Sequence, residues 1–263
     1  MSWAPPMLHA APRDASTLAW NIPPAELTLA PGEVHVWRAD LDAVGDTDVA
    51  QLTLLLAPDE RARAGRRVHA PDRQRVIVGR AALRMVLARY AGVDAACLTF
   101  GRTAAGKPVL TEPPDSALRF STSHSAGLAL CAIVAGREVG VDVERILRGP
   151  MEDVVADRTL SPTELSVLRA LGPGGRDRAF FAVWTRKEAY AKARGLGLAL
   201  AFERFSVSAA PDAPALLDAE DDDPRRWTMY DLPAGDGYAA ALVVEGAVGR
   251  PMCWAWSPAV SAR

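Results

Sequence analysis

Two apolar stretches of the chain match each other: Gly127-Leu-Ala-Leu-Cys-Ala-Ile-Val-Ala-Gly136 and Gly237-Tyr-Ala-Ala-Ala-Leu-Val-Val-Glu-Gly246. They share their length, their apolar character and their flanking glycines, and each predicts a buried strand between turns. An ancient duplication would explain the match. However, any two buried strands between glycines look alike, so the two stretches alone leave duplication and coincidence open.

Other predicted elements follow a repeating order. In the first half, period-two alternation predicts a strand at 33–39, and helical spacing predicts a helix at 76–90 that Gly92 would end. The second half has the same kinds of element, predicted as a helix at 177–194 and strands at 202–208, 227–232 and 238–245. If the duplication is real, residues 136–140 join the two halves, and junctions between domains are places where ligand sites form.

Composition bounds the class of protein. With 263 residues, 49% of them hydrophobic, the chain can bury a sizeable core. Its net charge of −2, its 6% aromatic content and the lack of a recognised module argue against nucleic-acid binding. Three widely spaced cysteines predict reduced thiols, not disulfides or a zinc site. With no apolar run long enough for a membrane span and no secretory signal at the start, we expect a cytoplasmic protein.

Two acidic motifs offer the strongest chemical signal. The segment Gly-Val-Asp-Val-Glu at 140–144 alternates as a strand does, so Asp142 and Glu144 share a face. In Trp-Thr-Arg-Lys-Glu-Ala-Tyr-Ala-Lys at 184–192, Glu188 and Lys192 lie one helical turn apart. Three carboxylates and an ammonium suit a Mg²⁺ ion held against a phosphate. The same spacing would be found if Asp142 and Glu144 lay on a solvated strand edge and Glu188 and Lys192 formed a surface ion pair. Spacing alone therefore does not decide between a metal site and solvated charges.

A hydroxyl-rich run, Phe-Ser-Thr-Ser-His-Ser-Ala-Gly at 120–127, precedes the first apolar stretch. Hydroxyls, backbone N–H groups and an imidazole suit phosphate binding. Serine nucleophile chemistry is disfavoured because the Gly-x-Ser-x-Gly elbow is missing, and because Ser123 and His124 would point to opposite faces of an extended segment. The basic turn at 102–108 lacks the spacing of a Walker loop, although it could still touch a nucleotide.

Taken in order, these motifs resemble the 4′-phosphopantetheinyl transferases of the large, pseudo-dimeric surfactin type. The resemblance covers about residues 54–244 and rests on four motifs, followed by Gly195-Leu-Gly197: Gly106-Lys107-Pro108, and the segments 120–125, 140–144 and 184–192. It implies an α+β fold of two similar halves, each a helix packed on a small, mostly antiparallel sheet, related by a pseudo-twofold axis. We therefore expect an extension at 1–31, poorly ordered or leading into the first strand, and halves at 32–138 and 139–263, the latter with the metal-binding motifs.

The resemblance also implies an activity. The 4′-phosphopantetheine arm of coenzyme A would pass to a serine hydroxyl of an apo acyl or peptidyl carrier protein, with release of adenosine 3′,5′-bisphosphate. Asp142, Glu144 and Glu188 would hold Mg²⁺, or Mn²⁺ in its place, on the pyrophosphate. The catalytic residues would be Glu188, which would also deprotonate the carrier serine, together with Asp142 and Lys192, whose ammonium would neutralise the pyrophosphate.

The implied coenzyme A ligands come from the hydroxyl-rich run, the Gly-Lys-Pro turn, the basic region after residue 60 and the second acidic motif. They are Arg63, Arg66, Arg102, Gly106, Lys107, Pro108, Ser123, His124 and Lys192. His124 would lie near the 3′-phosphate. Relatives place lysines soon after the equivalent of Pro58, where this chain has Glu60 and Arg63, so Arg66 is the preferred phosphate contact in that region.

Several expectations about partners remain. A duplicated chain already contains the interface that shorter family members form by oligomerising, so we expect a monomer. The sequence locates no carrier-docking surface and leaves open whether the carriers serve peptide, polyketide or fatty-acid synthesis. The acidic segment at 212–224 is expected to be a solvated loop. Two other functions stay open: a Mg²⁺-dependent pyrophosphohydrolase acting on coenzyme A or nucleotides, and a non-catalytic coenzyme A binding module.

Overall fold

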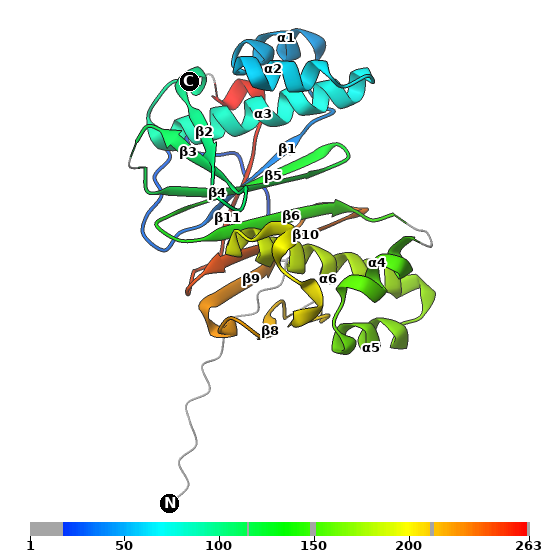
Figure 1. The fold of residues 1–263 in the computed structure, drawn as a ribbon. Coiled ribbons are helices and arrows are strands. Elements are labelled where there is room, and N and C mark those ends of the chain that lie inside the picture. Colours follow the sequence, from blue (N-terminus) through cyan, green and yellow to red (C-terminus); the bar gives the residue numbers. More distant parts are fainter. Residues whose placement is uncertain (1–17, 115, 148–150, 211–212, 262–263) are drawn as a thin grey trace, which may run out of the picture.

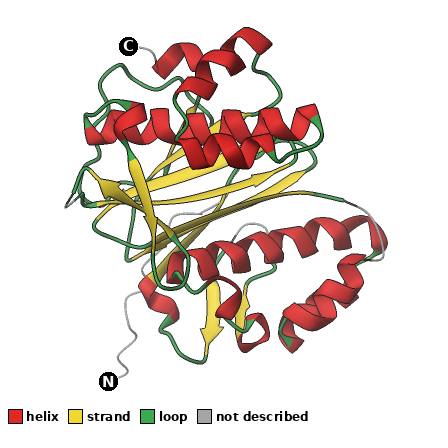
Figure 2. Cartoon of the chain, turned by 45° about the horizontal axis from the view of Figure 1, so that its top comes forward, coloured by secondary structure: helices red, strands yellow, loops and turns green. Residues whose placement is uncertain are grey.

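The computed structural model describes residues 18–114, 116–147, 151–210 and 213–261, and its elements lie in four layers. One group of helices covers one sheet, a second group covers another sheet, and the two sheets face each other in the middle (Figures 1 and 2). Each sheet is thus apolar on both faces, while each helix group needs one apolar face only. Within the described ranges, no helix is both long enough and apolar enough to cross a membrane.

The first half of the chain contributes eight of the labelled elements: β1 (His35–Asp40), α1 (Asp46–Leu54), α2 (Pro58–Gly65), α3 (Ala70–Ala91), β2 (Thr99–Arg102), β3 (Pro108–Glu112), β4 (Leu118–Ser125) and β5 (Leu128–Ala135). The second half contributes the others: β6 (Val139–Arg145), α4 (Met151–Thr159), α5 (Pro162–Ala170), α6 (Pro173–Arg194), β7 (Phe205–Val207), β8 (Leu216–Ala219), β9 (Trp227–Asp231), β10 (Tyr238–Glu245) and β11 (Met252–Ala255). The long helices α3 and α6 both end at a glycine in the left-handed conformation, Gly92 and Gly195. The backbone N–H of each glycine donates to a carbonyl of the last helical turn and so ends the helix.

Two main sheets carry the fold. Their strand orders are β11-β1-β5-β4 and β6-β10-β9, and β1 with β11 is the one parallel pair in these two sheets as described. The matched apolar stretches become β5 and β10, each with a strand on both sides. These features confirm the α+β class with small, mostly antiparallel sheets. The last strand, β11, crosses back to the first sheet, so the end of the chain packs on the first half.

Three apolar clusters hold the layers together. One lies between α3 and the first sheet, a second between the two sheets, and a third between α6 and the second sheet. Strand β6 sends Val141 and Val143 into the middle cluster, where both are fully buried. Because side chains alternate along a strand, Asp142 and Glu144 take the opposite face of β6, toward α6. The central core therefore fixes which way the acidic motif points.

The structure differs from the sequence expectations in several places. Strand β4 occupies the hydroxyl-rich run, and α4, α5 and β11 are elements that the sequence pattern does not predict. The strand expected at 202–208 is a 3₁₀ turn followed by the three-residue β7. Residues 1–17 of the expected N-terminal extension lie outside the described residues, whereas Leu18 is buried and Trp20 Nε1 donates to Pro233 O at 2.6 Å.

The expectation of a solvated acidic loop at 212–224 is wrong for Asp222. Its side chain is 1% exposed and accepts hydrogen bonds from Tyr190 Oη at 2.9 Å and Trp227 Nε1 at 2.7 Å. Two arginines, Arg194 and Arg226, neutralise it. Burial would raise the pKa of this carboxyl, but these hydrogen bonds and charges outweigh burial and lower it. Asp222 thus ties α6 to the start of β9.

Candidate active site

The candidate site lies where the edge strands β4 and β6 of the two sheets meet. Ser121, Ser123 and Ser125 occupy alternate positions of β4, and their hydroxyls all reach β6. Ser121 Oγ accepts a hydrogen bond at 3.1 Å from a backbone N–H of β6. The other two bind the acidic motif: Ser123 Oγ donates to Asp142 Oδ1 at 2.7 Å, and Ser125 Oγ donates to Glu144 Oε2 at 2.8 Å. The hydroxyl-rich run therefore reaches the predicted metal-binding carboxylates directly.

Asp142 is the most enclosed acidic group of the site, with a residue exposure of 3%. Its Oδ1 accepts from Ser123 and from Lys192 Nζ, both at 2.7 Å, and Lys192 also donates to Val141 O at 3.2 Å. Its Oδ2 is buried without a hydrogen-bond partner among the described residues. Such an oxygen is costly in a low dielectric, which makes it a place for a ligand. Lys192 thus forms its ion pair with Asp142 on β6. The surface ion pair between Lys192 and Glu188 that the sequence left open is therefore not its main contact.

Two half-buried glutamates complete the acidic group. Burial raises the pKa of Glu144, and Asp142 raises it further, while the Ser125 hydrogen bond and Lys192 act in the opposite direction. Burial also raises the pKa of Glu188, with Asp142 and Glu144 adding to the rise and Lys192 opposing it. Asp142 thus disfavours the ionisation of both glutamates, and Glu144 disfavours that of Glu188. A cation placed among them would relieve this repulsion.

Gly140 explains how the helix comes so close to the strand. A Cβ at this position would overlap Ala189 O and lie 2.5 Å from Ala193 N, both backbone atoms of α6. Only a residue without a side chain allows that approach. Gly140 lies on the same face of β6 as Asp142, and Glu188 and Lys192 belong to the facing part of α6. The glycine of the first acidic motif therefore sets the distance between the two motifs.

Buried ion pairs fix α6 from its other side. Lys187 Nζ is 0% exposed and donates to both Glu164 oxygens, at 2.7 and 2.9 Å, and to Phe205 O at 2.6 Å. Arg186, also 0% exposed, pairs with Asp231 on β9. These contacts explain two charged residues of the second acidic motif to which the sequence gives no role. Since Arg186 and Lys187 directly precede Glu188, these ion pairs hold the adjoining backbone of α6 in place.

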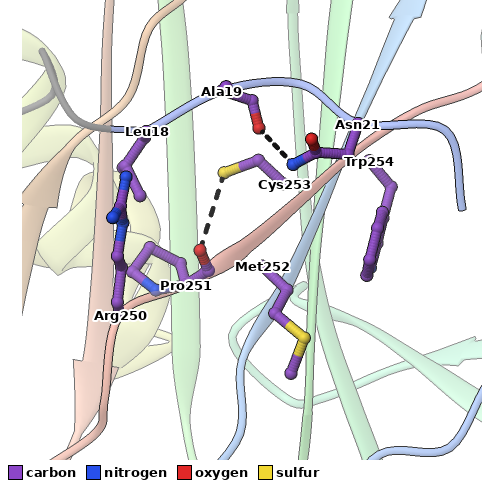
Figure 3. Close-up of a pocket in the computed structure, with 8 residues that line it drawn as sticks. All are labelled: Leu18, Ala19, Asn21, Arg250, Pro251, Met252, Cys253 and Trp254. Carbon is purple, nitrogen blue, oxygen red and sulfur yellow. Dashed lines mark hydrogen bonds between the residues drawn. The ribbon is translucent and has the colours of Figure 1, made fainter.

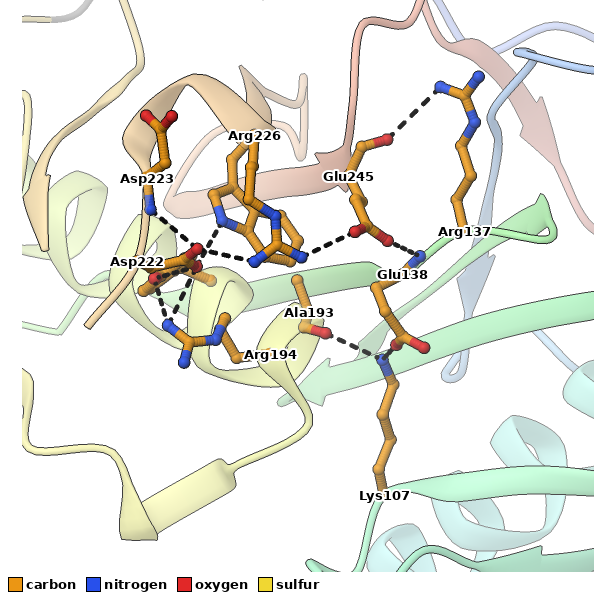
Figure 4. A network of polar contacts seen from close by, with 11 residues as sticks. Lys107, Arg137, Glu138, Ala193, Arg194, Asp222, Asp223, Arg226 and Glu245 are labelled. Carbon is orange, nitrogen blue, oxygen red and sulfur yellow. Dashed lines mark hydrogen bonds and ion pairs between the residues drawn. The ribbon is translucent and has the colours of Figure 1, made fainter.

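Lys107, from the Gly-Lys-Pro turn, bridges the two halves of the chain. Its ammonium donates to Glu138 Oε2 at 2.6 Å, to Val139 O at 3.1 Å and to Ala193 O at 3.4 Å. Figure 4 shows that Glu138 in turn joins a network through Glu245 that ends at the buried Asp222. Lys107 therefore binds the start of β6 and the end of α6 at once. Its three donors are all used by protein acceptors.

The remaining predicted ligands lie on the first half of the chain. His124 keeps an exposed edge, yet partial burial lowers its pKa, and the charges of Lys192, Arg63 and Arg67 lower it further. Arg63 and Arg67 are thus near enough to the ring to act on it, and Arg67 is absent from the predicted ligand set. Arg66, the preferred contact from sequence, follows the last residue of α2 and is exposed.

Arg102 of the basic turn and Glu60 of α2 also lie on the first half of the chain. Arg102 is exposed and donates to Gly106 O at 2.8 Å, so it closes the turn that presents Pro108. Glu60 is buried and paired with Arg80 and Arg84. Glu60 therefore anchors α2 to α3 and leaves Arg63, on the exposed side of α2, free to face solvent.

A cavity of about 310 Å³ lies elsewhere, at the edge of the first sheet opposite β4 (Figure 3). Residues 18, 19, 21 and 250–254 line it, among them Cys253, whose thiol pKa burial raises to about 12. A thiol held in its neutral form is a poor nucleophile. Asp142, Glu144 and Glu188 are not among the residues that line this cavity.

The donor set of the acidic group fits a hard cation. In the described part of the chain, no three Asp, Glu, His or Cys side chains are already gathered as a ligating cluster. The unpartnered Oδ2 of Asp142, and the rise that the Asp142 charge causes in the pKa values of Glu144 and Glu188, are nevertheless compatible with a shared cation. Mg²⁺ binds through one or two carboxylates together with water and substrate phosphates.

Comparison with known proteins gives consistent results. Residues 45–136 match the family model for the N-terminal part of 4′-phosphopantetheinyl transferases, and residues 138–243 match that of the 4′-phosphopantetheinyl transferase superfamily. The chain is 36% identical over 236 residues to 4′-phosphopantetheinyl transferase HetI of Nostoc sp., covering 89% of this chain and 97% of that protein. It is 30% identical over 166 residues to 4′-phosphopantetheinyl transferase Sfp of Bacillus subtilis, covering 63% and 72%.

Among solved structures, the chain has a more distant likeness to a holo-(acyl-carrier-protein) synthase from Bacillus anthracis in complex with coenzyme A. The sequence identity is 27% and the TM-score 0.35, over 42% of this chain and 96% of that one. The two family models together span most of the chain, and the relative from Nostoc is matched over nearly its whole length. The chain therefore belongs to the 4′-phosphopantetheinyl transferase superfamily and is an enzyme that transfers phosphopantetheine to carrier proteins.

Proposed function

We propose that this transferase is Mg²⁺-dependent, acts on a serine hydroxyl of the apo carrier and releases adenosine 3′,5′-bisphosphate from coenzyme A. One observation carries the proposal: the buried and unpartnered Oδ2 of Asp142 beside two glutamates whose pKa values are raised. Three carboxylates in one partly buried group would be unfavourable without a cation. The proposed cation would therefore neutralise this group together with Lys192.

Asp142, Glu144 and Glu188 are the proposed metal ligands. When bound, Mg²⁺ would screen the pyrophosphate charge and polarise the phosphorus–oxygen bond that breaks. Lys192 contributes a fixed positive charge beside Asp142, at 2.7 Å, and would stabilise negative charge that develops on the leaving oxygen. Gly140 and the ion pairs of Arg186 and Lys187 hold these groups in place, so little reorganisation is needed during the reaction.

Glu188 is the proposed general base. None of the described residues donates a hydrogen bond to its carboxylate, and burial raises its pKa, which favours proton uptake. The serine proton would pass to Glu188 directly or through one water. The serine oxygen would then bond to the phosphorus that carries the pantetheine arm, and the bond from that phosphorus to the bridging pyrophosphate oxygen would break. The electron pair would leave with adenosine 3′,5′-bisphosphate.

The first half of the chain is proposed to bind the rest of coenzyme A. His124 with Arg63 would meet the 3′-phosphate, and Arg67 joins them because it acts on the same ring. Ser123 and Arg66 remain proposed phosphate contacts, and Arg102, Gly106, Lys107 and Pro108 remain the proposed border of the adenine end. The proposed halves are 32–138 and 139–263, within a monomer, and the change from one family model to the other at residues 136–138 supports a division near residue 138.

Intact-mass spectrometry of an apo carrier tests this function. After incubation with the enzyme, coenzyme A and Mg²⁺, the carrier is expected to gain the phosphopantetheine mass on one serine, and chelation of the metal is expected to prevent the gain. The same reaction without carrier separates the proposal from pyrophosphohydrolase chemistry. Release of the bisphosphate at an equal rate without carrier would contradict the proposal.

A further inference from the structure

The serines of β4 have two different kinds of partner on β6. Ser121 binds backbone only, whereas Ser123 and Ser125 each bind one carboxylate of the acidic motif. Ser123 already shares Asp142 with Lys192, so the aspartate has two donors. For Glu144, Ser125 is the one hydrogen-bond donor among the described residues. The orientation of Glu144 therefore depends on a single hydroxyl.

Ser125 is itself held in place by the backbone of β6. Its Oγ accepts a hydrogen bond from Arg145 N at 3.1 Å while it donates to Glu144 Oε2 at 2.8 Å. A hydroxyl has one proton and two acceptor sites, so both bonds are satisfied together. Arg145 is the last residue of β6, and Glu144 precedes it. At the end of a strand a glutamate side chain has several rotamers available, and the Ser125 bond selects one.

We propose that Ser125 is a positioning residue for the metal site: it fastens Glu144 Oε2 so that Oε1 is directed to the cation. The arrangement parallels Asp142, where a serine holds Oδ1 and leaves Oδ2 unpartnered. In each carboxylate, one oxygen is thus held by a serine hydroxyl, and the other oxygen would be available to the cation. The inference rests on the proposed function, because it assumes that Glu144 ligates the metal. Groups that orient metal ligands in this way commonly change metal affinity by about 10–100-fold when removed.

The test compares variants of Ser125 with a matched control. Ser125→Ala removes the hydroxyl, and the pair Ser125→Thr and Ser125→Val keeps one shape while changing only the hydroxyl. Ser121→Ala is the control, since it weakens the same β4–β6 junction without touching a carboxylate. Mn²⁺ binding to each protein in the presence of coenzyme A would be measured by electron paramagnetic resonance, together with the Mg²⁺ concentration for half-maximal transfer and the melting temperature.

We expect Ser125→Ala and Ser125→Val to weaken Mn²⁺ binding about 10-fold or more. Ser125→Thr and Ser121→Ala should bind Mn²⁺ within about 3-fold of the wild-type enzyme, although Ser121→Ala should melt at a lower temperature because it leaves a buried N–H unpaired. If Ser125→Ala is unfolded, the Thr and Val pair decides. Equal Mn²⁺ affinity for that pair, or for Ser125→Ala and the wild-type protein, would overturn the inference alone. No Mn²⁺ binding by the wild-type enzyme would overturn the proposed function, and the inference with it.

Discussion

Replacement of Gly140 by alanine probes the contact that joins the two acidic motifs. The new Cβ would lie 2.5 Å from Ala193 N, which is 0.9 Å short of the 3.4 Å where ordinary contact begins, and still closer to Ala189 O. Both obstructing atoms belong to the backbone of α6, so no side-chain rotation relieves the overlap. The helix must withdraw by more than about 1 Å, which for an overpacked core costs about 3 kcal/mol. Displacement of a catalytic group by about 1 Å lowers a rate about 100-fold.

The assay is the rate of carrier modification at saturating coenzyme A, measured with the melting temperature of the same samples. For a chain of this size, a loss of about 3 kcal/mol corresponds to a fall of about 6–12 °C in melting temperature. Gly79→Ala is the matched control, because it lies in α3 and its Cβ would meet Leu41 Cδ2 at an ordinary 3.6 Å. That variant should be as active as the wild-type enzyme and slightly more stable. A Gly140→Ala protein with wild-type rate and melting temperature would refute the proposed packing of α6 on β6.

Three further predictions follow from the charged groups. Lys187→Met leaves Glu164 buried without its partner and should lower the free energy of unfolding by about 3–5 kcal/mol, whereas adding Glu164→Gln should restore most of it in a urea titration. Asp222→Asn leaves two arginines without their carboxylate and should cost about 2 kcal/mol in the same assay. The raised pKa values of Glu144 and Glu188 stabilise the metal-free protein fully below their ordinary value of 4.5, and this contribution is lost as pH rises through the raised values. Mg²⁺ with coenzyme A should therefore raise the melting temperature more at pH 8 than at pH 5, and a shift independent of pH would contradict this reasoning.

The sequence predicts the parts of the fold that have a clear period or a glycine at their end. The helix ending at Gly92 and the two matched apolar stretches are found as α3, β5 and β10, because burial imposes a regular apolar pattern on such elements. Strand β4 lacks this pattern, since its inward side chains are serines that bind the neighbouring sheet. Helix α5 does have a signal: Ser161 and Glu164 form a capping box, which precedes its apolar residues.

The carboxylates of the site follow from motif spacing, but their partners depend on tertiary contacts. The run of acidic residues that contains Asp222 suggests a solvated loop, and only the folded chain brings Tyr190 from α6 to bury it. In the same way, the ammonium of Lys107 meets Glu138, which lies 31 positions later in the chain, and no spacing argument predicts that pair. Spacing arguments relate residues within one element. They do not show which elements will be neighbours.

The most direct test of the proposed metal site compares Mn²⁺ binding and carrier modification for Asp142→Ala, Glu144→Ala and Glu188→Ala with those of the wild-type enzyme. The wild-type enzyme should bind one Mn²⁺ in the presence of coenzyme A and add one phosphopantetheine mass to the apo carrier. Each variant should bind Mn²⁺ about 10-fold more weakly or worse, and Glu188→Ala should lose the most turnover because it also removes the proposed base. Wild-type metal affinity and carrier modification in all three variants would contradict the account.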